Sequence, residues 1–598
     1  MTAALREWEQ HMKRGRQHVE HAELEDALKS YNTALHICES VTDFPNATHC
    51  RRLVLNGLGR TIRRLGKYAQ AVDLLNEGLA GLDLCPDLVE MSLELAEIYL
   101  YQNQIEDAKY LLEKSCETAK HLQYEEGLCR AIGNLGKVNY ELSQRNHDPK
   151  LLEEGIQQLL ERIQYARNIR QTNEATRPDP AAEERYLEMI RLESTGMSRL
   201  SRCYSVRGDK EKALLTASDA LKLIAGSPNI HSAAMSHLFY GLALQRNGQA
   251  EEALKHFNPA ISCTPALALC HEPSKEHREY LKELVDAGAD MDRLDKNGYS
   301  ALDYAVFSGD VDFEKLVLDG MHRNAERRIN ELYNEAKLRK LLRVLFQEKV
   351  RPLLQRSRDG NTLQNVRRMY ADELAGNDEK NPNLDGLKFV RYFDFKSLGR
   401  LPTYSDDLTN PWTPKPVDIG VESGDVADFL IFFSYKWMNR EGLGTGQSPD
   451  DDSNTQYFRM VNAVENFLQR HPDIQEERLG IWVDFACINQ RNPAPGVSAL
   501  PIIVAQCDAV ISLVDAEYYD RAWCCVEVLI IQALKRSYSR HYYWFEYVEA
   551  QGYSEEKAVG VLREGRGDLA IGVAGKHLTF EEDRRKVLFL ERQSKLLG

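Results

Sequence analysis

The sequence has 598 residues, 43% of them hydrophobic and 28% charged, which is the composition of a globular chain divided into several domains. Its formal net charge is -15 without a strongly basic block, which argues against binding to nucleic acid or to an anionic membrane. The start of the chain has no signal-peptide core, and no apolar run approaches the roughly 18 residues that a membrane helix needs. The twelve cysteines form no CxxC pair. We therefore expect a cytoplasmic protein with reduced thiols and no membrane span.

Residues 1–275 have a helical pattern that repeats itself. The segment 207–214 matches the segment 247–254 at an offset of forty residues, and further copies begin near residues 24, 65 and 103. In each copy a tight turn precedes a helix that opens near a small alanine, so that two antiparallel helices can approach closely. The pattern resembles tetratricopeptide repeats. The resemblance implies an α-solenoid that binds protein partners through its concave face, either a peptide or another part of the chain. A spacer without a ligand is the alternative.

Residues 276–322 resemble an ankyrin repeat. The motif Ser300-Ala301-Leu302-Asp303 takes the place of the Thr-Pro-Leu-His of that family. Gly288, Gly298 and Gly309 stand where turns require a permissive backbone. Only one to two repeats fit, which is too few for an independent domain. We expect this segment to cap the solenoid rather than to form a separate binding surface.

Residues 323–424 are predicted to connect two domains. Up to about residue 370 the pattern is that of an amphipathic helix with mixed charge, interpreted as a helical linker in preference to a calmodulin-type target. From 371 to 424 the chain is rich in Pro, Asp and Asn, which indicates an irregular connector.

Residues 425–550 contain four continuous apolar runs, at 428–433, 480–485, 509–514 and 542–545. Continuous hydrophobicity is typical of strands buried on both faces, as in a parallel sheet. A predicted helix at 457–470 separates the first two runs. The alternation predicts a doubly wound α/β fold with a parallel sheet in a flavodoxin-like order. Residues 551–598 are predicted to be a helical extension.

Polar and aromatic residues follow the ends of these predicted strands. They are residues 434–437 after the first strand, Asp484 and Cys487 after the second, and Asp515 after the third. Ligands of doubly wound sheets bind beyond the carboxyl ends of the strands. The sequence therefore predicts a site at this edge.

Three short motifs in this region carry a family resemblance. Residues 432–436, residues 507–514 and the Trp-Cys-x-Val-Glu pattern of 523–527 resemble the first strand, a later strand and the Trp-Cys-x-x-Glu helix of Toll/interleukin-1 receptor (TIR) domains. Residues 481–490 are similar to the Trp-x-Asp-x-x-Cys-Ile-Asn-Gln signature of fungal heterokaryon-incompatibility (HET) domains. The resemblance covers about 425–550.

The resemblance implies self-association for signalling and, in some members, cleavage of NAD to nicotinamide and ADP-ribose. NAD would be a substrate, and no cofactor or metal is predicted. The implied catalytic residue is Glu527, and the implied substrate-binding residues are Ser434, Tyr435, Lys436, Trp437, Asp484, Cys487 and Trp523. One carboxylate suffices for this chemistry. The nicotinamide ring of NAD is already cationic, so it leaves as a neutral molecule without an acid to protonate it. The alternatives are a structural Glu527 and a strand-end hydrogen-bond acceptor role for Asp484.

Together these features suggest an immune-type or incompatibility-type signalling protein, with fungi implied by the second resemblance. A repeat scaffold would bind a protein partner and restrain or release a TIR-like effector. The rival hypothesis is a non-enzymatic adaptor in which the sheet domain only binds partners and Glu527 is structural.

Overall fold

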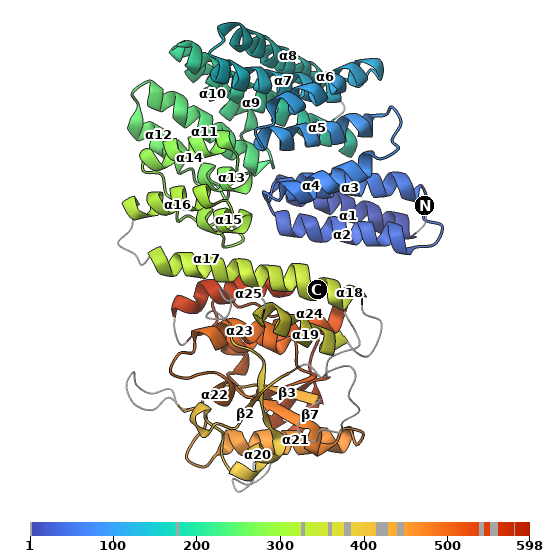
Figure 1. The fold of residues 1–598 in the computed structure, drawn as a ribbon, viewed down its shortest axis with the longest axis vertical. Helices are drawn as coiled ribbons and strands as arrows, with labels where there is room; N and C mark the ends of the chain where they lie inside the picture. Colours follow the sequence, from blue (N-terminus) through green and yellow to red (C-terminus); the bar gives the residue numbers. More distant parts are fainter. Residues whose placement is uncertain are drawn as a thin grey trace. The chain divides into compact units, whose positions relative to one another are not determined.

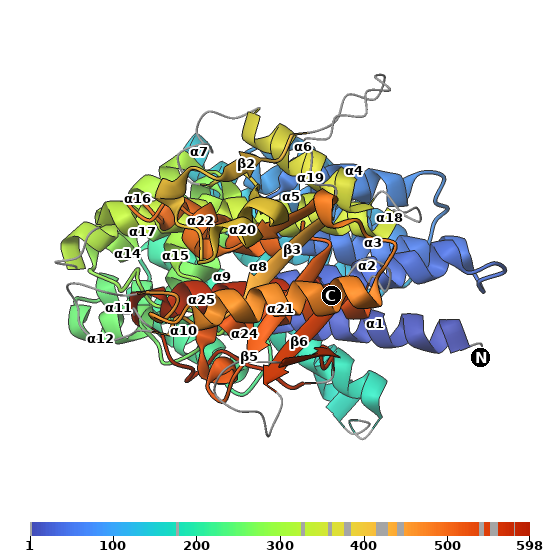
Figure 2. The same cartoon turned by 90° about the horizontal axis from the view of Figure 1, so that it is seen from below.

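The computed structural model describes residues 3–174, 177, 179–324, 329–356, 362–375, 384–413, 429–438, 448–537, 543–549, 560–567, 569–578 and 581–597. The chain folds as two compact units, Met1–Lys337 and Leu338–Gly598. Figure 1 and Figure 2 show the ribbon from two directions, coloured from blue at the N-terminus to red at the C-terminus. The domain bounds expected from the sequence remain a prediction.

The first unit is built from helices over its described residues. They are α1 (Ala3–Glu20), α2 (Leu24–Ser40), α3 (Ala47–Arg63), α4 (Tyr68–Leu79), α5 (Pro86–Tyr101), α6 (Ile105–His121), α7 (Glu125–Asn146), α8 (Pro149–Glu174), α9 (Pro180–Arg207), α10 (Lys210–Ile224), α11 (Ile230–Arg246), α12 (Ala250–Phe257), α13 (Pro265–His271), α14 (Lys275–Asp286), α15 (Ala301–Ser308), α16 (Val311–Asn324) and α17 (Ile329–Arg343). The predicted helical repeats are therefore present as a solenoid.

Neighbouring helices of the solenoid pack in pairs, such as α1 with α2, α5 with α6 and α11 with α12. In each of the five repeat copies noted in the sequence, an alanine follows the turn, and its small side chain lets the second helix lie close to the first. These alanines are at most 1% exposed, as the pattern predicted: Ala27, Ala71, Ala108, Ala213 and Ala253.

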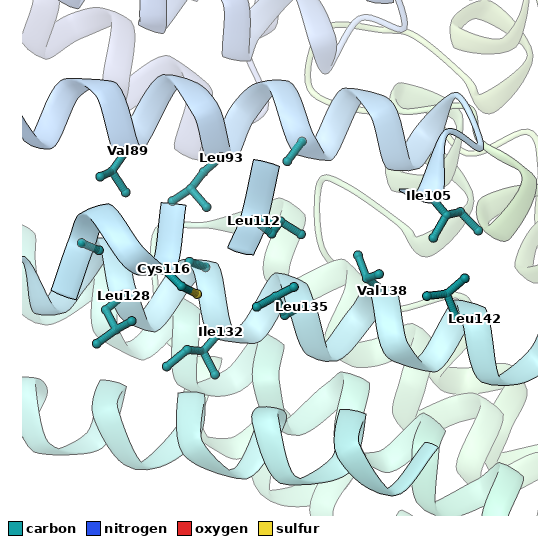
Figure 3. Close-up of a cluster of buried hydrophobic side chains, with 13 residues drawn as sticks. Val89, Leu93, Ile105, Leu112, Cys116, Leu128, Ile132, Leu135, Val138 and Leu142 are labelled. Carbon is teal, nitrogen blue, oxygen red and sulfur yellow. The ribbon is translucent and has the colours of Figure 1, made fainter. Parts of the chain in front are cut away.

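Apolar side chains from three consecutive helices form one of the clusters that hold the solenoid together. Figure 3 shows Leu93 of α5, Leu112 of α6 and Ile132 of α7 among the side chains of this cluster. On α5, for example, the members of this cluster, Val89, Leu93 and Ala96, are three or four residues apart, and this spacing places them on one face of the helix. Each helix thus buries its apolar stripe against the next, which is why stability in such an array comes from neighbouring repeats.

The ankyrin-like segment contacts both ends of this helical series. At one end, Tyr280 of α14 packs edge-on against Phe239 of α11, with ring centroids 5.4 Å apart. At the other end, the segment contacts the start of α2. Tyr299 Oη donates to Glu25 Oε2 of α2 at 2.9 Å, and Lys296 Nζ lies 2.7 Å from Oε1 of Glu23, the residue just before α2. Ser300 caps α15 and exchanges hydrogen bonds with Asp303 in a capping box. The motif singled out in the sequence is thus a helix start.

The second unit contains helices and seven strands over its described residues. Its elements are η1 (Val344–Val350), α18 (Arg351–Arg356), α19 (Thr362–Ala375), β1 (Lys388–Arg391), α20 (Tyr392–Leu398), η2 (Tyr404–Asp406), β2 (Thr409–Pro411), β3 (Phe429–Ser434), α21 (Thr455–Arg470), η3 (Glu476–Arg478), β4 (Leu479–Trp482), α22 (Asp484–Cys487), α23 (Ala494–Val504), β5 (Ala509–Val514), η4 (Tyr518–Asp520), α24 (Ala522–Ser537), β6 (Tyr543–Glu549), β7 (Gly560–Glu564), η5 (Glu581–Asp583) and α25 (Arg584–Leu597).

The strands form one mixed sheet in the order β2-β1-β4-β3-β5-β6-β7. The four predicted strands are its centre, and β4, β3, β5 and β6 run parallel to one another. Asp428 and Tyr542, the first residues of two predicted strands, lie outside the described residues. Phe432 pairs with Trp482, and Ser434 pairs with Ser512, so the ends of β3 and β5 lie side by side.

Three strands beside the central four, two of them at the edges of the sheet, correct the expectation of a purely parallel sheet. β1 and β2 pair antiparallel within the segment predicted as an irregular connector, and β7 pairs antiparallel within the segment predicted as helical. Each has at most five residues, and β2 ends at Pro411. β2 and β7 are edge strands, which tolerate proline and need no continuous apolar run, and β1 has only four residues. The hydrophobic pattern that revealed the central strands therefore did not reveal these three.

Helices cover both faces of the sheet within the second unit. Figure 1 shows α23, α24 and α25 on one face and α20 and α21 on the other, and Figure 2 shows α21 lying across the strands. The predicted helix at 457–470 is confirmed as α21. The apolar runs of the central strands are therefore buried on both sides. The apolar side chains from Leu430 to Phe433 in β3 and from Leu479 to Trp482 in β4 are each at most 2% exposed.

Candidate functional site

The carboxyl ends of the parallel strands bring several predicted site residues together in the second unit. Ser434 is the last residue of β3, Asp484 is the first residue of α22 after β4, and Glu527 lies on α24 after β5. Because parallel strands end at the same edge, these polar groups meet there. Two connected groups result, one around Glu527 and one around Asp484.

Glu527 is a buried carboxyl with a hydroxyl partner. Ser434 Oγ donates to Glu527 Oε2, and the same hydroxyl is hydrogen-bonded to Tyr518 Oη. The residue is 9% exposed. Burial raises the pKa of Glu527 to about 8, the Ser434 hydrogen bond opposes this rise, and the charge of Asp484 adds to it. The Glu527 carboxyl is therefore largely protonated at neutral pH.

Asp484 accepts three hydrogen bonds from predicted site residues and its own helix start. Tyr435 Oη donates to Oδ1 at 2.6 Å, Trp437 Nε1 donates to Oδ2 at 2.9 Å, and the Phe485 amide donates to Oδ1 at 2.7 Å. Burial raises the pKa of Asp484 despite these donors. Both aromatic residues implied to bind a substrate thus hold the Asp484 carboxyl by their polar ends.

The remaining predicted site residues have other surroundings. Lys436 Nζ lies 2.5 Å from Glu517 Oε2 and 3.5 Å from Asp515 Oδ2, the acids that follow β5. Cys487 is buried one turn after Asp484, and burial raises the pKa of its thiol to about 12. Trp523 Nε1 donates to Asp583 Oδ2 at 3.3 Å. Lys436 and Trp523 therefore bond to groups outside the Glu527 and Asp484 clusters.

Tyr518, in η4, was not among the predicted site residues. Its side chain is fully buried and hydrogen-bonded to the Ser434 hydroxyl that also bonds Glu527. Burial raises the pKa of this phenol well above its usual range, so it acts as a neutral donor. A tyrosine just before a helix gives no sequence signal of such a contact, because the contact joins η4 to the end of β3, 84 residues away in the chain.

A second candidate site is a cavity of about 410 Å³ inside the first unit. Helices α1, α3, α5, α7, α8, α9 and α11 contribute to its wall. The lining includes nine arginines and seven glutamates, together with polar residues such as Asn134 and Ser198. The sequence predicted a binding surface on the concave side of the solenoid but named no residue for it. The charged lining suits a polar ligand.

Most of the buried arginines in this wall are paired with carboxylates. Arg63 contacts Glu94 at 3.2 Å, Glu97 at 2.9 Å and Glu272 at 3.2 Å. Arg130 contacts Glu94 at 2.7 Å. Buried ions are tolerated when they are paired and hydrogen-bonded in this way. The network joins α3, α5, α7 and the loop after α13.

Arg162 of α8 differs from these arginines. It is 3% exposed and lines the cavity, and its Nε donates to the Leu192 carbonyl at 3.1 Å. Over the described residues it makes no ion pair with a carboxylate. Burial lowers the pKa of Arg162 to about 10, and the nearby Arg191 and Arg199 lower it further. A buried guanidinium without a counter-ion is costly for the fold.

Two glycines in helix interiors make room for this side chain. A methyl group at Gly133 of α7 would overlap the Arg162 side chain, and one at Gly196 of α9 would lie 3.4 Å from its Cδ atom. Glycine in a helix interior is unfavourable unless close packing requires it. The sequence analysis did not single out these glycines, although glycines inside helices are a signal that could have indicated the close approach of α7, α8 and α9.

Comparison with protein families identifies ankyrin repeats at residues 267–317. The match begins before the predicted start at residue 276 and includes most of α13. That helix starts after Thr264, whose side chain accepts a hydrogen bond from the Leu267 amide, with Pro265 at the first helical position. Thr264-Pro265 therefore corresponds to the Thr-Pro that begins a helix in the ankyrin pattern. The sequence analysis did not identify this pair. No curated protein sequence matches the chain.

Several solved repeat structures resemble part of the chain at low identity. A putative kinesin light chain with TPR-like repeats from Podospora anserina is 20% identical over 36% of this chain and 94% of its own, with a TM-score of 0.25. A Rap protein complexed with competence and sporulation factor is 13% identical over 62% and 95%, with a TM-score of 0.33. The Rap conjugation regulator of plasmid pLS20, in complex with the Phr* peptide, is 13% identical over 55% and 75%, with a TM-score of 0.35.

The chain thus contains ankyrin repeats and a helical repeat scaffold suited to protein–protein interaction. No described helix combines the length and the apolar character needed to span a bilayer.

Proposed function

We propose that the first unit binds a peptide segment of a partner protein in its charged cavity, and that this binding regulates the second unit. The observation that carries the proposal is Arg162, a buried guanidinium that lines the cavity and makes no ion pair over the described residues. A carboxylate of the ligand would supply the missing counter-ion.

The chemistry of the wall favours a peptide with an acidic group. Asn134 beside Gly133 can both donate to and accept from a peptide backbone, and Ser198 and Ser236 share a hydrogen bond of 3.3 Å near the same wall. The mixture of glutamates and arginines suits a ligand with donors and acceptors of both signs. Repeat proteins present such concave surfaces to extended segments.

The test is selection of short displayed peptides by the full-length protein. We expect the selected peptides to share an Asp or Glu at one position. Arg162→Gln should weaken their binding about 10- to 100-fold, the cost of losing a charge-assisted hydrogen bond. The matched control is Arg167→Gln on the same helix, whose partner Glu193 keeps a second arginine, Arg170.

A change in the peptide completes the test. Replacing its acidic residue with the corresponding amide should weaken binding to the wild-type protein and leave binding to Arg162→Gln unchanged. Selected peptides without an acidic position, or equal binding by the wild type and Arg162→Gln, would refute the proposed contact. Regulation is tested by hydrogen exchange: a bound peptide should alter exchange in residues 429–597, and no change there would favour a simple adaptor.

A second candidate function is cleavage of NAD in the second unit, proposed as a TIR-like or HET-like domain over about 425–550. It is supported by the sequence motifs and by the meeting of Ser434, Asp484 and Glu527 at the carboxyl edge of the sheet. In this proposal ionised Glu527 would hold the ribose hydroxyls and stabilise the positive charge that develops as nicotinamide leaves. Its raised pKa would then make the rate increase as the pH rises through about 8.

Nicotinamide release by the full-length protein tests this second function. Glu527→Gln should lower the rate about 100-fold or more while the protein stays folded, since one electrostatic contact to a transition state is worth that much. The control is Glu477→Gln, because Glu477 is exposed after α21. Absence of release from the wild type between pH 6 and 9, or equal rates in the two variants, would leave Glu527 with a structural role.

A further inference from the structure

Three metal-binding side chains meet at the junction between the helical repeats and the ankyrin repeats. His231 is the second residue of α11, Cys263 lies just before α13, and His271 is the last residue of α13. One donor atom from each lies within 4.8 Å of the others. The two imidazole rings are stacked, with an interplanar angle of 14°. Cys263 and His271 are at most 2% exposed.

The ring nitrogens of this group lack hydrogen-bond partners over the described residues. Both His271 Nδ1 and Nε2 are buried without a partner, and so is His231 Nδ1. The Cys263 thiol makes only a long contact of 3.9 Å with the Thr264 carbonyl. Buried polar groups in native proteins almost always have a partner, so a cluster of unsatisfied donor atoms requires an explanation. A bound ion would satisfy one atom of each residue.

The protonation state of the histidines fits metal binding. Burial lowers the pKa of His271 to about 3 and lowers that of His231 well below its usual range, and the neighbouring Arg64 acts in the same direction. Neutral imidazole is the form that binds a metal ion. Arg64 also carries a positive charge beside the group, but Glu272 lies 3.4 Å from its Nε and offsets that charge.

We propose that His231, Cys263 and His271 bind a closed-shell late transition metal ion, either Zn²⁺ or Cu⁺. Two imidazoles and one thiolate are donors that both ions prefer, whereas hard ions such as Mg²⁺ require oxygen ligands. Binding releases the thiol proton to solvent, and the sulfur then bonds the ion as a thiolate. The proposal does not rest on peptide binding or on NAD cleavage.

The geometry requires only a small contraction. Around a tetrahedral zinc ion with bonds of about 2.0–2.3 Å, neighbouring donor atoms lie roughly 3.3–3.8 Å apart. The donors here would close by about 1 Å from their limit of 4.8 Å. His231 is also part of the cavity wall, so the ion would lie beside the cavity and would leave a position for a further ligand. It would join α11 to α13 and so fix the ankyrin repeats to the helical repeats.

The experiment uses the full-length protein, stripped of metal under reducing conditions and titrated with Co²⁺, Zn²⁺ or Cu⁺ alone. We expect one Co²⁺ per chain with a thiolate-to-cobalt charge-transfer band, which Zn²⁺ or Cu⁺ then displaces. Whichever ion binds more tightly and raises the unfolding temperature of the protein is the assigned ion. Cys263→Ser should remove the charge-transfer band and weaken binding about 100-fold or more, since even outer-shell changes cost 10- to 100-fold.

Cys270→Ser is the matched control, because Cys270 is buried next to His271 on the same helix but is not one of the three donors. It should keep both the charge-transfer band and the affinity. His271→Ala is a second variant. If it folds, it should keep the thiolate-to-cobalt charge-transfer band, because Cys263 is still present, but it should bind Co²⁺ more weakly. No band in the wild type, or a band that persists in Cys263→Ser and disappears in Cys270→Ser, would overturn the proposal.

Discussion

Two buried carboxyl groups, Glu94 in the helical unit and Glu527 in the sheet unit, have opposite kinds of partner. In the helical unit, buried carboxylates meet guanidinium groups: Glu94 contacts Arg60, Arg63 and Arg130. In the sheet unit, Glu527 meets the Ser434 hydroxyl and Asp484 meets a phenol and an indole. The difference lies in the partners: arginines from facing helices reach Glu94, whereas a hydroxyl, a phenol and an indole from the end of β3 and the residues that follow it reach Glu527 and Asp484.

The two arrangements predict opposite responses to pH. Burial disfavours the charge of Glu94, but its three arginines outweigh burial and lower the pKa to about 2. A lowered carboxyl pKa stabilises the fold above its ordinary value of about 4.5, and this stability is lost as the pH falls toward 2. The raised pKa of Glu527 has the reverse effect, so stability falls as the pH rises from about 4.5 to about 8.

The largest expected effect is the loss of a buried carboxylate in the helical unit. Glu272→Gln would leave the guanidinium groups of Arg63 and Arg64 with less counter-charge, since both lie within 3.4 Å of this carboxylate. We expect a loss of about 3–5 kcal/mol of unfolding free energy. Hydrogen exchange in residues 3–324 during urea unfolding of the full chain measures it. Glu106→Gln, at an exposed pair with Arg145, should change less than about 0.5 kcal/mol, and equal effects would refute the comparison.

A gain of stability is expected for the sheet unit. Glu527→Gln replaces a carboxyl that must ionise in a buried place above pH 8 with a neutral group of the same shape. At pH 9 the variant should be more stable than the wild type by an amount of the order of 3 kcal/mol, with little difference at pH 5. Thermal unfolding at the two pH values, read by exchange in residues 429–537, checks this. A variant that is less stable at pH 9 would show that Glu527 is ionised and paired.

Arg162→Met tests a cavity arginine that has no ion pair with a carboxylate among the described residues. Methionine keeps much of the length of the side chain and removes a buried charge that has no carboxylate partner in the described structure. We expect the helical unit to gain about 1–3 kcal/mol while peptide binding is lost. Unfolding in urea gives the first quantity, and the selected peptides give the second. A destabilised variant would mean that a partner for Arg162 is present in the free protein.

The smallest expected effect concerns the Ser434 hydroxyl. Ser434→Ala removes the hydrogen bond that favours the charged form of Glu527, so the pKa of Glu527 should rise further and stability at neutral pH should fall by about 1 kcal/mol. The measurement is the pH at which the decline in stability ends, compared with the wild type, because that pH follows the pKa of Glu527 in the folded protein. Ser453→Ala, at an exposed position before α21, serves as the control. No shift of that pH would show that the two side chains are not coupled.

The sequence predicted the elements that have strong local patterns. Alanines after turns marked the helical pairs, and continuous apolar runs marked the four central strands. It did not predict the edge strands β2 and β7, which need no apolar run, or β1, which has only four residues. The sequence also placed residues of the candidate site at the strand ends without predicting all of their partners. Lys436 follows β3 as expected, yet its charge is held by Glu517 and Asp515 from the next strand end.

The sequence by itself determined where helices and central strands form, since periodicity and turn residues act over a few neighbouring positions. Tertiary structure alone decided which distant charges meet. Arg63 and Glu272 are 209 residues apart, and Ser434 and Glu527 are 93 residues apart. The pKa of a buried group depends on those meetings and on burial, which no local pattern encodes. For the same reason the isolation of Arg162 and the convergence of His231, Cys263 and His271 emerge only in the folded chain.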